Sequence, residues 1–145
     1  VLEPGRSLVG NAGTLLTRVE YVKRGEEKNF VVVDAAMNDL MRPALYQAYH
    51  AVENVSRPDA PQITADIVGP ICETGDFIGK ERQIGAAQGD ILAIRSAGAY
   101  ASSMASNYNA RCRAAEVMID EQGNSRLVRR RETLDDLLAT EREYL

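Results

Sequence analysis

The sequence predicts a mainly β chain, an all-β sandwich or barrel that follows a short α/β segment. About six to eight short apolar or alternating stretches are separated by turns that contain glycine, proline or asparagine. Apolar residues at helical spacing are confined to the two ends of the chain. We therefore divide the chain into an entry segment, residues 1–16, and a β-domain with a terminal helix, residues 17–145.

The entry segment is predicted to be a strand end, a turn and a short helix. The chain opens without an initiator methionine on Val1-Leu2, which is typical of the end of a buried strand, so we expect a piece of a longer protein. Pro4 and Gly5 indicate a turn over residues 3–6. Residues 7–16 carry apolar side chains on one helical face, despite two glycines.

The β-domain is predicted to begin with a hairpin, in which residues 17–23 and 30–33 are strands and residues 24–29 form a polar turn. Pro43 discourages a continuous helix in the mixed segment 36–46. Further strands are expected at residues 48–55, 62–68, 91–94, 114–120 and 126–130. Thr133, with Asp136 three residues later, resembles a capping box, and Leu134, Leu137 and Leu138 give the last helix its apolar face.

Composition excludes several classes of function. The net charge of −4 argues against nucleic acid as the main partner, and the basic run 129–131 is expected at a solvated strand end. A membrane-spanning stretch and a signal segment are absent from the sequence, and two cysteines are too few for a disulfide framework, so the cytoplasm is the expected location. His50 is the only histidine, which excludes a catalytic triad or a His-rich metal site within this chain.

The turn Glu3-Pro4-Gly5-Arg6 precedes a predicted helix start. Backbone N–H groups there, with a glycine that allows close approach, can hold a phosphate, and Arg6 adds a forked donor. An ordinary tight turn that enters a helix is the simpler explanation of these four residues taken alone.

Cys72 and Glu73 form a thiol–carboxylate pair between Gly69-Pro70 and Gly75-Asp76. A thiol can deliver a proton and a carboxylate can hold an ammonium group. A buried, inert cysteine is the alternative.

Arg42 and Tyr46 face the same way if their segment makes a helical turn, and together they would suit a carboxylate. Tyr100 follows Gly98-Ala99, where small residues let the backbone pass close to a ligand. A surface arginine and two packed tyrosines are the simpler explanation of these residues taken singly.

Taken together, four segments resemble the C-terminal motifs of fold-type III pyridoxal-phosphate decarboxylases that act on basic or diamino acids. The order and spacing of these segments carry the resemblance: residues 3–6 (EPGR), 41–46 (MRPALY), 69–76 (GPICETGD) and 98–100 (GAY). The Cys-Glu-x-Gly-Asp form looks like diaminopimelate decarboxylase, since related ornithine decarboxylases usually place Asp after the cysteine.

The resemblance implies an N-terminal (β/α)8 barrel and a C-terminal Greek-key β-barrel or sandwich domain. Residues 1–16 would be the end of the (β/α)8 barrel, and residues 17–145 the β-domain. Cys72 would be the catalytic proton donor. Substrate-binding roles would fall to Arg6, Arg42, Tyr46, Glu73 and Tyr100, and cofactor-binding roles to Glu3, Gly5, Arg6 and Tyr100. Cys72 and Glu73 would reach the partner subunit's site in a homodimer.

The implied activity is a lyase step in lysine biosynthesis, the decarboxylation of meso-2,6-diaminopimelate to L-lysine. Pyridoxal 5'-phosphate would be bound mainly by the missing barrel, where the Schiff-base lysine of the family lies. The three lysines of this chain, Lys23, Lys28 and Lys80, lie in polar, turn-like surroundings, and none of them resembles that Schiff-base lysine. We therefore expect this chain alone to be inactive.

Two alternatives remain open at this level. The enzyme could be a related decarboxylase that acts on ornithine or another polyamine precursor. The chain could instead be a non-catalytic β-domain that serves dimerisation, although a pure scaffold has no need of Cys72, Glu73, Arg6 and Arg42.

Overall fold

The structure, a computed structural model, describes residues 1–144. The chain divides into two compact units, Val1–Ala105 and Ser106–Leu145, and each is described by itself. None of the helices within the described range is long and apolar enough to cross a membrane.

The first unit begins with two short helical segments and then forms six strands. A third helical segment lies between the second and third strands, and a fourth follows the sixth strand. The helical segments are α1 (Arg6–Val9), η1 (Gly10–Ala12), α2 (Arg42–Tyr46) and η2 (Ser102–Met104). The strands are β1 (Leu15–Lys23), β2 (Asn29–Val33), β3 (Val52–Asn54), β4 (Ile63–Val68), β5 (Phe77–Ile84) and β6 (Ile91–Ile94).

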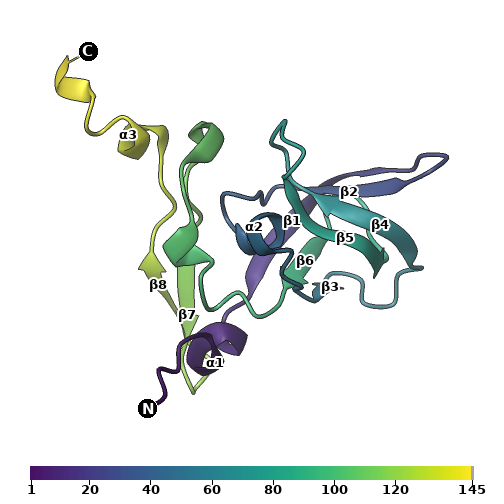
Figure 1. Ribbon diagram of the computed structural model, residues 1–145, viewed down its shortest axis with the longest axis horizontal. Helices are drawn as coiled ribbons and strands as arrows, with labels where there is room; N and C mark the ends of the chain where they lie inside the picture. The colour runs from purple at the N-terminus through teal and green to yellow at the C-terminus, as the bar shows by residue number, and fades with distance from the viewer. Residues whose placement is uncertain (145) are drawn as a thin grey trace. The chain divides into compact units, whose positions relative to one another are not determined.

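The six strands form one sheet in the order β3-β6-β1-β2-β4-β5 (Figure 1). All neighbours are antiparallel except β2 and β4, which are parallel. β1 is shared by both halves of the sheet: Leu15 pairs with Ile94 of β6, and Lys23 pairs with Phe30 of β2. A bulge between Val19 and Tyr21 bends β1 between these two pairings.

The curved sheet brings its two edge strands near one another, so that it is almost closed into a barrel. β3 approaches β5, and the Asn54 side chain at the end of β3 donates a hydrogen bond of 2.7 Å to the carbonyl of Gly85, just after β5. The predicted mainly β fold with a barrel-like sheet is confirmed.

Alternating side chains from the strands fill the interior of this barrel. The largest fully buried apolar side chains are Leu40, Ile67, Ile78, Leu92, Ile94, Val19, Val31 and Val33. Burying each such side chain contributes about 1.5–3 kcal/mol of transfer free energy. The core therefore holds the loops between strands in place at the rim.

Asp90 fixes the loop that enters β6. Its carboxylate accepts hydrogen bonds from Asn54 Nδ2 at 2.8 Å and from the Ala87 N–H at 2.9 Å, and Arg57 Nη2 lies 2.7 Å away. The Arg57 guanidinium is the main cause that holds the pKa of the Asp90 carboxyl well below its usual range, and the Ala87 and Asn54 donors add to it against the effect of burial.

Asp90→Asn is expected to lower the free energy of unfolding at pH 7 by about 1–3 kcal/mol, because buried donors lose a charged acceptor. A carboxyl whose pKa is lowered by folding stabilises the protein above its unfolded pKa, about 4, and this contribution is lost as the pH falls toward the folded-state value. Urea unfolding at several pH values between 3 and 7 should therefore show a flatter pH dependence in the variant. The exposed Asp59→Asn is the control, and an equal loss there would contradict the assignment.

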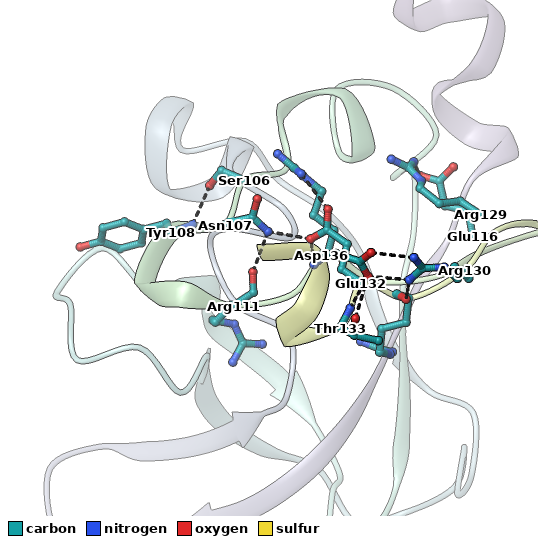
Figure 2. Close-up of polar contacts among 12 residues, drawn as sticks. Ser106, Asn107, Tyr108, Arg111, Glu116, Arg129, Arg130, Glu132, Thr133 and Asp136 are labelled. Atoms are coloured by element: carbon teal, nitrogen blue, oxygen red, sulfur yellow. Dashed lines mark hydrogen bonds and ion pairs between the residues drawn. The ribbon is translucent and has the colours of Figure 1, made fainter. Parts of the chain in front are cut away.

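The second unit is a small hairpin with flanking turns. It contains β7 (Glu116–Ile119) and β8 (Ser125–Arg129), which pair antiparallel, and the short helical segments η3 (Tyr108–Ala110), α3 (Leu134–Leu137) and η4 (Arg142–Tyr144). Polar contacts join the segments on either side of the hairpin (Figure 2). The Glu132 carboxylate accepts hydrogen bonds from the Arg113 N–H at 2.8 Å and from Asn107 Nδ2 at 2.6 Å, and these donors lower its pKa.

Several local expectations in the second unit are confirmed. The hairpin forms as predicted, and Thr133 and Asp136 make both bonds of a capping box. The basic run lies at an exposed strand end, where Arg129 pairs with Glu116 and Arg130 binds both oxygens of Asp136 (Figure 2). The last helix is a single turn, α3, which ends at Leu137 just before the predicted apolar Leu138 and is followed by η4.

Other boundaries differ from the prediction. Val1 and Leu2 are exposed and lie in no strand, because no partner strand is present for them in the described chain. The helix predicted for residues 7–16 ends at Ala12, since Leu15 and Leu16 pair with β6 instead. β3 is shorter than predicted, and α2 forms because Pro43 lies in its first turn, where a missing N–H costs nothing. β5 was not predicted.

Candidate functional site

The N-terminal helical turns are bound tightly to the segment that follows β6. The N–H groups of Ala97 and Gly98 donate to the carbonyls of Gly13 and Gly10, each at 2.9 Å. A Cβ on Gly98 would lie 1.9 Å from the Val9 carbonyl oxygen, so only glycine permits this approach. As a result, Gly5 lies next to Tyr100: a Cβ on Gly5 would be 3.1 Å from the Tyr100 hydroxyl oxygen.

Arg42 begins α2, and Tyr46 ends it one turn later. The buried residues Leu40 and Pro43 hold this helix against the core, and Gln47 ends it in the left-handed conformation at φ 53°. The predicted same-side arrangement of Arg42 and Tyr46 is present, with the guanidinium carbon 5.8 Å from the ring centre of Tyr46.

Arg42 also faces Tyr100, whose ring centre is 5.5 Å from the guanidinium carbon. Cations near aromatic faces are attracted by about 0.5–1 kcal/mol at exposed sites. Tyr100 has a φ of 60°, a conformation that is uncommon for a residue with a side chain and costs on the order of 1–3 kcal/mol. The surrounding structure thus holds Tyr100 in a strained position beside Gly5 and Arg42.

These segments surround a cavity of about 740 Å³. Five of the residues predicted to bind substrate or cofactor line it, and they come from the N-terminal turn and α2: Glu3, Gly5, Arg6, Arg42 and Tyr46. Tyr100 adjoins the same group through Gly5 and Arg42. The cavity joins predicted site residues of these two segments that are 36–43 positions apart in the sequence.

The donor set of the cavity suits an anionic ligand. Two guanidinium groups, Arg6 and Arg42, line the cavity together with one carboxylate, Glu3, and guanidinium forks match carboxylate and phosphate oxygens. The side of Gly5 where a Cβ would stand is already filled by the Tyr100 hydroxyl, so Gly5 brings that hydroxyl close to the backbone beside the cavity. These residues therefore fit the carboxylate of an amino acid or the phosphate of a cofactor.

They do not include a lysine to which a carbonyl cofactor could be attached. Lys28 is paired with Asp66 at 2.7 Å, Lys80 lies over the Phe77 ring at 4.1 Å, and Lys23 is exposed at the end of β1. None of these three lines the cavity as the structure describes it.

His50 is a lining residue to which the sequence pointed only as the single histidine. It is 4% exposed, and its Nδ1 lies 2.9 Å from the Arg95 carbonyl oxygen. Because a carbonyl only accepts, Nδ1 donates the hydrogen of this bond. Nε2 is buried with no hydrogen-bond partner among residues 1–144, so it is available to a polar group of a ligand or of further chain.

Cys72 and Glu73 lie on the loop between β4 and β5, outside the set of residues that line the cavity. Both side chains are exposed, so the alternative that Cys72 is buried is wrong. The Glu73 carboxylate has one weak contact, with the Gly75 N–H at 3.4 Å, and is available to a ligand. The structure therefore brings the arginines and tyrosines together but leaves the thiol–carboxylate pair on a separate surface.

The fold and the cavity define a class of protein domain. Residues 8–98 match the family described as the C-terminal sheet domain of pyridoxal-dependent decarboxylases, and the chain belongs to that family. In the part of the chain that the structure describes, no group of three or more His, Cys, Asp or Glu residues could hold a metal ion.

Within this class, the similar proteins are diaminopimelate decarboxylases. The chain is 71% identical to the diaminopimelate decarboxylase of Neisseria meningitidis over 97% of its length, and 60% identical to that of Pseudomonas aeruginosa, also over 97%. The Helicobacter pylori enzyme, solved in complex with L-lysine, superposes with a TM-score of 0.91 at 43% identity over 99% of the chain. The chain covers 34%, 34% and 35% of these three proteins, respectively, so it spans about a third of their length.

Proposed function

We propose that this chain is the C-terminal part of a pyridoxal-phosphate-dependent decarboxylase that converts meso-2,6-diaminopimelate to L-lysine and carbon dioxide. The observation that carries the proposal is the close likeness of nearly the whole chain to diaminopimelate decarboxylases. The L-lysine in the Helicobacter pylori structure supports it, since L-lysine is the product of the proposed reaction.

The cavity would bind the anionic groups of the reactants. Arg6, Arg42 and Tyr46 would hold the substrate carboxylate, because two guanidinium groups and a phenol can donate to its oxygens from several sides. Glu3, Gly5, Arg6 and Tyr100 would lie beside the cofactor, where Gly5 lets the Tyr100 hydroxyl come close to the backbone. When bound, pyridoxal phosphate supplies the electron sink that lets an α-carboxylate leave.

Cys72 and Glu73 would complete the site from a second subunit. An exposed thiol can deliver a proton to the substrate α-carbon after carbon dioxide has left, and an exposed carboxylate can hold the distal ammonium. Since both lie outside the cavity of their own chain, we propose a homodimer with active sites shared between subunits. We also propose that the enzyme acts in the cytoplasm.

The test is a decarboxylation assay of the full-length protein with pyridoxal phosphate. We expect L-lysine and carbon dioxide from meso-diaminopimelate, with a kcat/KM at least about 100-fold above that for ornithine or arginine, as sites that pair a buried polar group of the substrate commonly achieve. Preference for ornithine would favour the related decarboxylase, and no activity on any of them would favour a dimerisation domain.

The isolated chain is the matched control in the same assay. It should release no carbon dioxide, and borohydride reduction with pyridoxal phosphate should trap no stoichiometric adduct on Lys23, Lys28 or Lys80, because none of them lines the cavity. A stoichiometric adduct at one defined lysine, read by peptide mass spectrometry, would show that the cofactor lysine lies in this chain.

A further inference from the structure

We propose that Asp76 is a positioning residue whose carboxylate holds the Cys72–Glu73 loop in place and ties it to the segment that leads into α2. The loop runs from Gly69 to Asp76, between β4 and β5. This inference rests on the proposed function only in one respect, the role of Cys72 as the proton donor. The bonding of the loop by the Asp76 carboxylate is a property of the fold alone.

The Asp76 side chain is buried, with 4% of its surface exposed, and each of its oxygens has a separate partner. Oδ2 accepts the Ile71 N–H at 2.7 Å, directly before Cys72, and Oδ1 accepts the Met37 N–H at 2.7 Å. Such charge-assisted bonds to backbone donors are about twice as strong as neutral ones. One carboxylate therefore joins two loops that are 34 positions apart, at Met37 and Ile71.

Backbone bonds close the same loop around Asp76. The Gly69 N–H donates to the Asp76 carbonyl at 3.1 Å, and the Asp76 N–H donates to the Glu73 carbonyl at 3.0 Å. A Cβ on Gly69 would lie 2.4 Å from Asp76 Oδ2, so glycine is needed there to leave room for the carboxylate. The loop is thus built around this carboxylate, with Cys72 and Glu73 exposed at its outer side.

The hydrogen bond from Met37 to Asp76 also bears on the position of Arg42, which lines the cavity. The Ala36 carbonyl accepts hydrogen bonds from Asp39 and Leu40, and the fully buried Leu40 fixes this turn two residues before Arg42. A shift at Met37 would therefore be passed to α2, whereas a shift at Ile71 would move Cys72. Asp76 links the two halves of the proposed catalytic apparatus within one subunit.

Asp76→Asn is the informative change, made in the full-length protein. An amide keeps one acceptor oxygen but places an NH2 donor against one of the two backbone N–H donors, so one bond is lost and two donors face each other. We expect Cys72 to react about threefold or more faster with maleimide as the loop loosens. We also expect kcat to fall roughly tenfold with little change in KM, because small misplacement of a reacting group affects the chemical step.

Labelling of individual cysteines is followed by peptide mass spectrometry, with Cys112 in the second unit as the internal reference. Asp90→Asn is the matched control: it removes another buried, backbone-bonded carboxylate, in the loop before β6, and should leave Cys72 labelling and kcat unchanged. If Asp76→Asn does not fold, Gly69→Ala displaces the carboxylate while keeping the charge, and it should give the same change in Cys72 labelling.

Wild-type Cys72 labelling in Asp76→Asn or Gly69→Ala, or an equal change in Asp90→Asn, would overturn the proposal. Faster Cys72 labelling with an unchanged kcat would support the hold by Asp76 and contradict the catalytic role of Cys72. Failure of the inference is in this way separated from failure of the proposed function.

Discussion

Cys72→Ala in the full-length protein is expected to lower kcat for meso-diaminopimelate by on the order of 1,000-fold. Delivery of a proton by a positioned acid typically contributes 10²–10⁴-fold, and the methyl group of alanine has no proton to give. KM should stay within about threefold of the wild type, because the groups proposed to bind the substrate carboxylate lie in the cavity and are untouched.

The matched control is Cys112→Ala, which removes the half-buried thiol of the second unit and should leave kcat unchanged. Sedimentation velocity should give the same oligomeric state for both variants, since one thiol adds little to an interface. A Cys72→Ala enzyme with wild-type kcat would contradict the proton-donor role and would point to water or another side chain as the acid.

The parts of the fold that the sequence predicted well are those decided by local chemistry. The hairpin of β7 and β8 follows from the turn composition of residues 121–125, and the Thr133–Asp136 capping box needs only three-residue spacing. β5 was missed because its middle is charged: Lys80 and Glu81 are exposed on an edge strand, where charges prevent pairing with other chains.

The candidate site was only partly predictable, because its assembly depends on tertiary contacts and not on local chemistry. The residues came from motifs, but their grouping depends on contacts between distant segments. Nothing in the spacing of Gly13 and Gly98 indicates that their backbones touch, and this contact is what brings Gly5 to Tyr100. Similarly, Asp76 belongs to the motif of residues 69–76, but no role could be predicted for it, because its hydrogen-bond partner Met37 lies 39 positions away.

Glu73→Gln is expected to lower kcat/KM for meso-diaminopimelate by on the order of 100-fold, as loss of a charged hydrogen-bond partner costs about 1.5–3 kcal/mol. Glu73 is exposed and held only by a weak contact to Gly75, so its carboxylate is free to pair with a distal ammonium. A neutral amide of the same size keeps the shape of the loop and removes the charge.

An analogue of the substrate that lacks the distal amino group distinguishes this role from a structural one. If Glu73 binds that ammonium, the wild type should discriminate strongly between the two substrates, whereas Glu73→Gln should process the analogue about as well as the wild type does. The exposed Glu121→Gln in the second unit is the control for a change of charge alone. Equal losses on both substrates in Glu73→Gln would instead mean that Glu73 supports the loop around Cys72, and selectivity for a diamino acid would then have to come from outside this chain.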